Sequence, residues 1–67
     1  MKYEYRVRRL NWLDEREYAQ VYGDFITWGA FDSATVYEDK GAAWVVAERV
    51  KELGAGRAVG VNARAKP

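Results

Sequence analysis

The chain has no cysteine and no histidine, and Ser33 is its only serine. These absences exclude disulfides, thiolate nucleophiles, imidazole bases, and zinc sites built from thiolates or imidazoles. No apolar run approaches the length of a membrane span, and residues 1–6 lack the apolar core of a secretory signal. We therefore expect a soluble, cytoplasmic protein without membrane attachment.

Aromatic side chains are abundant instead, with three tryptophans, five tyrosines and two phenylalanines among 67 residues. A chain of this length forms a single domain, residues 1–67, and buries only about 60% of the surface that its unfolded form exposes. Such domains usually gain support from disulfides, metals or oligomerisation. Since the first two are largely excluded, aromatic packing and self-association remain, and a homodimeric scaffold is one alternative.

The net charge of +1 conceals a segregation of charge along the chain. Residues 1–13 carry a net charge of +3, residues 14–39 carry −6, and residues 40–67 carry +4. An acidic middle between basic ends can steer a charged partner, although the same charges also keep a small domain soluble.

Alternating polar and apolar residues predict a strand over residues 2–9, with Tyr3, Tyr5 and Val7 on one face. Further extended segments are expected at residues 25–28, 34–37 and 57–65. Residues 11–24 leave two interpretations open. Either a short helix, capped by Asp14, covers residues 15–22, or this stretch is an extended loop.

The clearest element is a helix over residues 40–53, which begins after the N-cap residue Asp39 and ends at Gly54. Its apolar stripe consists of Ala43, Val46, Ala47, Val50 and Leu53. The order of elements predicts an α+β fold, in which a three- or four-stranded antiparallel sheet carries one long helix, about residues 40–53, on one face.

Catalysis has little support in this sequence. The acidic pair Glu38 and Asp39 is better explained by the positive end of the helix, and so small a domain cannot enclose a deep cleft between two carboxylates. The glycines at 54 and 56 follow a helix, whereas phosphate-binding loops precede one. We expect no catalytic residues, no metal site and no cofactor.

Protein binding fits the aromatic content better. We expect Trp28 and Trp44 in the interior, and Trp12, Tyr18 and Tyr22 at the surface. The candidate partner-binding residues are Trp12, Asp14, Glu15, Glu17, Tyr18 and Tyr22. This aromatic and acidic surface suits a basic groove, such as one on a nucleic-acid-handling protein.

Nucleic-acid binding is the main alternative. It would use a basic sheet face made of Lys2, Arg6, Arg8, Arg57 and Arg64. Against it, Tyr3 and Tyr5 alternate away from Arg6 and Arg8, where no base could stack on them.

The segments 37–43 (Tyr-Glu-Asp-Lys-Gly-Ala-Ala) and 47–50 (Ala-Glu-Arg-Val) resemble small uncharacterised proteins of bacteriophages and prophages. In those proteins a strand of the type Ala34-Thr35-Val36-Tyr37 precedes an alanine-rich helix and a valine-rich strand, here Val59–Val61; the resemblance covers residues 25–65. It implies an accessory factor that binds one host protein in the host cytoplasm, as anti-CRISPR and other anti-defence inhibitors do. We therefore expect a phage-type inhibitor that docks on a bacterial protein.

Overall fold

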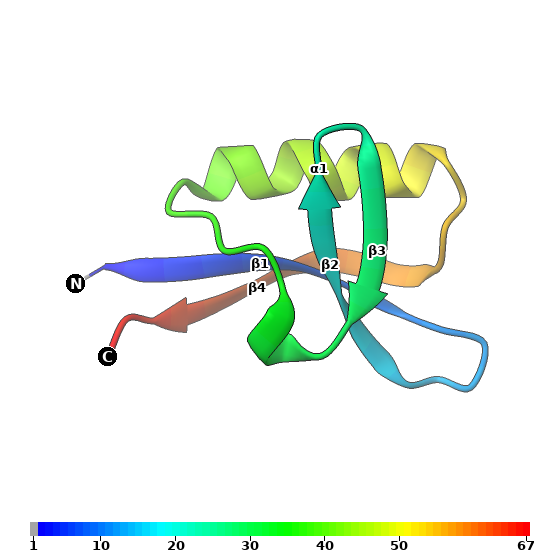
Figure 1. Cartoon of the computed structure of the whole chain (residues 1–67), viewed down its shortest axis with the longest axis horizontal. Coiled ribbons are helices and arrows are strands. Elements are labelled where there is room, and N and C mark those ends of the chain that lie inside the picture. Colours follow the sequence, from blue (N-terminus) through cyan, green and yellow to red (C-terminus); the bar gives the residue numbers. More distant parts are fainter. Residues whose placement is uncertain (1) are drawn as a thin grey trace.

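The computed structural model describes residues 2–67. The elements follow the order β1 (Tyr3–Leu10), β2 (Arg16–Tyr22), β3 (Phe25–Gly29), the short 3-10 helix η1 (Phe31–Ser33), α1 (Lys40–Glu52) and β4 (Arg57–Ala65). The strands form one antiparallel sheet in the order β3-β2-β1-β4, and α1 lies along one face of it (Figure 1). The expected α+β fold with one long helix on a four-stranded antiparallel sheet is confirmed.

Strand β2 corrects both interpretations of residues 11–24. Residues 16–22 form neither a helix nor a loop: β2 pairs with β1, placing Tyr18 opposite Arg8, and with β3, placing Tyr22 opposite Phe25. Its hydrogen bonds go to other strands, so no local capping pattern could reveal them. The predicted extended segment at residues 34–37 is reduced to a single bridge between Tyr37 and Tyr5.

Helix α1 has the ends that its sequence predicts. The Asp39 side chain accepts a hydrogen bond from the Gly41 N–H at 3.2 Å. At the other end Gly54 adopts a φ of 64°, and the N–H groups of Gly54 and Ala55 bond back to the carbonyls of Lys51 and Val50. These two bonds form a Schellman cap, which needs a residue that tolerates the left-handed conformation.

The core is built from small side chains between α1 and the sheet. Val7, Ala19, Ala43 and Ala47 are buried together, with larger residues packed around them. Alanines on the inner side of α1 let the helix approach β1 and β4 closely. Within residues 2–67, no helix combines the length and the apolar character that crossing a bilayer requires.

Four of the predicted core positions can be compared with this arrangement. Val59 and Val61 of β4 pack against the core, as expected, and so does Trp28 of β3. Trp44 remains 36% exposed on the flank of α1, so it is only partly interior.

The two faces of the sheet differ in what covers them. Tyr5 and Val7 point toward α1, so the intervening residues of β1 point to the opposite side, which we call the open face. The strands contribute Glu4, Arg6, Arg8, Leu10, Arg16, Tyr18, Gln20, Tyr22, Phe25, Thr27, Arg57, Asn62 and Arg64 to the open face. Helix η1 reaches over the open face, through the ring of Phe31 and the hydroxyl of Ser33.

Candidate functional site

The hairpin loop, residues 11–15, joins β1 to β2 and presents two apolar side chains to solvent. Trp12 is 97% exposed and Leu13 is 77% exposed. Large apolar residues that stand free at a loop tip gain nothing from the fold, because the fold does not remove them from water. Their position therefore points to contact with another molecule.

Asn11 holds this loop in one conformation. Its Oδ1 accepts hydrogen bonds from the N–H groups of Leu13 at 2.9 Å and Glu15 at 3.0 Å. The Asn11 N–H donates to the Glu15 carbonyl at 2.9 Å, and the Asp14 N–H donates to the Asn11 carbonyl at 3.1 Å. The side chain of Asn11 thus replaces backbone partners inside the turn, a role to which asparagine is well suited.

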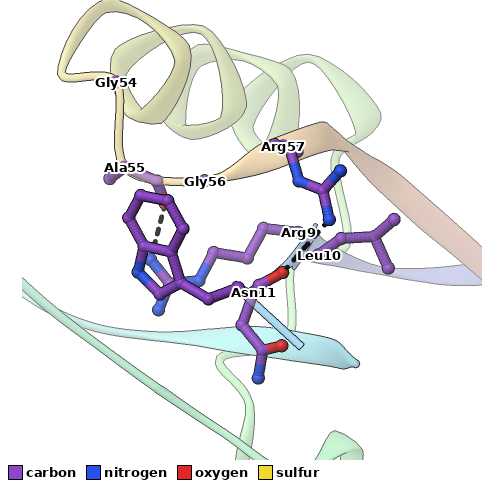
Figure 2. Close-up of a pocket in the computed structure, with 8 residues that line it drawn as sticks. Arg9, Leu10, Asn11, Gly54, Ala55, Gly56 and Arg57 are labelled. Carbon is purple, nitrogen blue, oxygen red and sulfur yellow. Dashed lines mark hydrogen bonds between the residues drawn. The ribbon is translucent and has the colours of Figure 1, made fainter. Parts of the chain in front are cut away.

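Arg57 of β4 ties the same loop to the body of the protein. Its guanidinium forms an ion pair with Asp14, which adopts a φ of 60°, and its Nη2 lies 3.5 Å from the carbonyl oxygen of Asn11. Figure 2 shows Arg57 reaching across to Asn11. The loop is therefore anchored both by its own asparagine and by a strand far away in sequence.

Beside the loop lies a cavity of about 210 Å³, whose lining comes from residues 9–12 and 54–57. Arg9 lines this cavity, and its Nη1 donates to the Ala55 carbonyl at 2.5 Å (Figure 2). Its Nε and Nη2 donate to Glu17 Oε1 at 3.1 and 3.0 Å. The Arg9 guanidinium also lies 4.0 Å from the centre of a Trp28 ring. Each guanidinium nitrogen donates a hydrogen bond and Glu17 balances the charge, so Arg9 shapes the cavity rather than offering a free charge to a ligand.

The structure brings together only part of the predicted partner-binding set. Trp12, Asp14 and Glu15 share the hairpin loop. Glu17 lies on the side of the sheet that faces α1, where it pairs with Arg9.

Tyr18 and Tyr22 lie on the open face instead. Tyr18 packs edge-on against Phe31, with the ring centres 5.1 Å apart. Tyr22 stands at the far end of β2, six residues from Arg16 and so ~20 Å away along the strand. The strand alternation of β2 thus separates residues that neighbour one another in sequence.

The residues of the basic alternative, by contrast, lie mostly on one face. Arg6 is only 8% exposed, forms an ion pair with Glu4 at 3.2 Å, and lies 4.0 Å from the centre of the Phe31 ring. Arg8 donates to the Ala58 carbonyl at 3.0 Å. Arg64 is exposed on the open face, whereas the charge of Arg57 is committed to Asp14. Lys2, which is also exposed, precedes β1.

Sequence reasoning missed four residues of these surfaces. Leu13 and Asn11 belong to the hairpin loop, and an asparagine three residues before an aspartate is a turn signal that could have located it. Arg16 and Phe31 belong to the open face, and no local pattern places them there because β2 was not recognised as a strand.

Comparisons with protein-family models, with curated proteins and with solved structures found no match. The resemblance to phage proteins therefore stays a prediction.

Proposed function

We propose that this chain is a small non-enzymatic binding protein that docks on another protein through its hairpin loop. Trp12 and Leu13 serve as the apolar anchors, and Asp14 and Glu15 form a polar rim around them. The observation that carries this proposal is the 97% exposure of Trp12 on a loop held in place by Asn11.

The energetics favour such a use of the loop. Covering one tryptophan side chain removes roughly 150–250 Å² from water, a gross gain of about 4–6 kcal/mol at 25 cal/mol per Å². Binding normally loses part of such a gain to the ordering of mobile segments. Here the hydrogen bonds that Asn11 Oδ1 accepts and the Arg57–Asp14 ion pair already order the loop before a partner binds. Tryptophan is also among the residues most enriched at the centres of protein interfaces.

The charges near the hairpin loop indicate the surface chemistry that a partner needs. Arg57 neutralises Asp14. Within the hairpin loop, Glu15 is then the acidic residue that forms no ion pair with residues 2–67. A complementary partner offers an apolar pocket for Trp12 with a basic group on its rim. A bacterial nucleic-acid-handling or defence protein with a basic groove fits this description. The sequence resemblance favours a more specific form of the proposal, in which the chain is a phage-type accessory factor that inhibits such a protein.

The test uses three immobilised versions of the chain as baits in a bacterial lysate: wild type, Trp12→Ala and Phe25→Ala. Phe25 is the matched control because it is also an exposed aromatic, but it lies in the other hairpin. We expect the wild type and Phe25→Ala to retain one protein that Trp12→Ala does not retain. After that protein is identified, calorimetry should give it a dissociation constant for Trp12→Ala at least tenfold higher than for the other two baits.

Equal retention by Trp12→Ala and wild type, with unchanged circular dichroism, would contradict the proposal. Analytical ultracentrifugation of the purified chain tests the homodimer alternative. A dimer that Trp12→Ala converts to monomer would identify the partner as a second copy.

A further inference from the structure

Strand β2 gives the open face a composition that β1 alone does not have. Its residues Arg16, Tyr18, Gln20 and Tyr22 alternate onto this face, with Arg16 opposite Leu10 and Tyr22 opposite Phe25. On β1 the tyrosines and the arginines alternate onto opposite faces, which weakened the nucleic-acid alternative. Strand β2 places Tyr18 and Tyr22 on the same face as Arg6 and Arg8. In Figure 1, η1 lies on the side of β1 and β4 away from α1.

Three of the arginines on the open face differ from the other arginines in having no carboxylate partner. Among residues 2–67, Arg6, Arg9, Arg49 and Arg57 each form an ion pair with a carboxylate. The other three arginines, Arg8, Arg16 and Arg64, form none in this part of the chain, and all three lie on the open face. Cationic groups without an internal counter-charge are available to an external anion.

Aromatic rings accompany these cations. Tyr22 is 64% exposed and Phe25 is 58% exposed, side by side where β2 meets β3. Tyr18 and Phe31 are half-buried and lie between this pair and the arginines. Exposed rings on a strand surface are platforms on which the faces of bases stack.

Arg8 is held close to the surface of the sheet. Gly60 of β4 lies opposite it, and a Cβ at Gly60 would lie only 3.3 Å from Arg8 Nη2. Because Gly60 has no side chain, the guanidinium extends over β4 and donates to the Ala58 carbonyl. Within residues 2–67 the other guanidinium N–H groups of Arg8 form no hydrogen bond, so they can bind a phosphate.

We propose that the open face binds single-stranded nucleic acid. Bases stack on Tyr22, Phe25 and Tyr18, while phosphates pair with Arg8, Arg16 and Arg64. Duplex is disfavoured because its bases are already paired and stacked on one another, so their faces cannot stack on the rings. An acidic peptide would use the arginines but would leave the rings without the flat partners that bases provide. This site is separate from the hairpin loop proposed for protein docking.

The test measures the fluorescence anisotropy of labelled pyrimidine DNA and RNA strands, about a dozen nucleotides long, across a salt series. With three phosphates neutralised, log K should fall with log salt at a slope of about −2, since each phosphate on a single strand contributes about 0.7. Binding of both strands or a preference for one supports the proposal and identifies the physiological ligand class as DNA or RNA. The matching duplex should bind more weakly.

Three variants on the face and two off it sharpen the result. Arg16→Gln should lower the salt slope by about 0.7. Tyr22→Ala should weaken binding about tenfold, and Tyr22→Phe should restore it, because stacking needs only the ring. Arg49→Gln, on the helix, and Trp12→Ala, in the hairpin loop, should bind as the wild type does.

Three outcomes would overturn the proposal: no binding at the lowest salt concentration, tighter binding of the duplex, or equal weakening by Arg49→Gln and Arg16→Gln. Displacement of the strand by polyglutamate, combined with no effect of Tyr22→Ala, would assign the face to acidic proteins instead. Because Trp12→Ala leaves this assay unchanged, its result is independent of the docking proposal.

Discussion

Arginines on the two faces of the sheet differ in their partners. On the face toward α1, Arg9 bonds to Glu17 and the Ala55 carbonyl and lies over Trp28. On the open face, Arg6 pairs with Glu4, whereas Arg16 and Arg64 have no carboxylate partner among residues 2–67. A guanidinium whose three nitrogens all donate within the protein stabilises the fold, and one without a counter-charge can pair with an external anion. The partners that the fold supplies, rather than the residue type, therefore distinguish Arg9 from Arg16 and Arg64.

The largest expected effect comes from removing the same side chain on the two faces. Arg9→Ala should lower the free energy of unfolding by about 2–4 kcal/mol, because it leaves Glu17 and the Ala55 carbonyl unpaired in a partly buried site. Arg16→Ala should change it by no more than about 0.5 kcal/mol, as expected for an exposed residue without partners. Urea denaturation measures both values, and equal losses would remove the distinction between the faces.

A second comparison probes how tightly Arg9 is packed. A Cβ at Gly56 would lie 2.6 Å from Arg9 Cδ, whereas a Cβ at Gly54 would meet nothing within 4 Å. Both glycines have positive φ, 138° and 64°. Gly56→Ala should therefore cost about 2–3 kcal/mol of unfolding free energy, from strain and displacement of Arg9, and Gly54→Ala about 1 kcal/mol from backbone strain alone.

Thermal unfolding of the two glycine variants under identical conditions tests this order. If Gly54→Ala lowered the unfolding free energy more than Gly56→Ala, the cap of α1 rather than the packing of Arg9 against Gly56 would control the stability of this turn.

The smallest effect belongs to a pair outside both faces. The Lys66 ammonium donates a hydrogen bond to Glu38 at 2.7 Å and lowers the pKa of that carboxyl below its ordinary value of 4.5. A lowered folded-state pKa gives stability above the ordinary pKa and loses it as pH falls through the folded value. Glu38→Gln should therefore destabilise the protein slightly at neutral pH and reduce its further loss of stability in acid.

Carbon-13 titration of the Glu38 carboxyl measures that pKa directly, with Glu48 in the same spectrum as a second exposed glutamate in an ion pair. A midpoint of Glu38 at or above 4.5 would show that the bond to Lys66 does not persist in solution.

Helix α1 was predictable because its signals are local: Asp39 caps one end, Gly54 ends the other, and an apolar stripe runs between them. Strand β2 was not, since Tyr18 and Tyr22 fit a helical spacing of four as well as the alternation of a strand. That error also affected the candidate site. The exposure of Trp12 was anticipated correctly, but Glu17 and Tyr18 point to opposite sides of the sheet.

By itself, the sequence determined the helix with its caps, the strand alternation of β1, and the absence of thiol and imidazole chemistry. Only the tertiary structure decided which arginines meet a carboxylate, which aromatics share a face with them, and how Asn11 and Arg57 hold the hairpin loop. The reason is that helix signals lie within a few residues of one another. Strand register, by contrast, is set by hydrogen bonds between segments as far apart as Arg8 and Gly60.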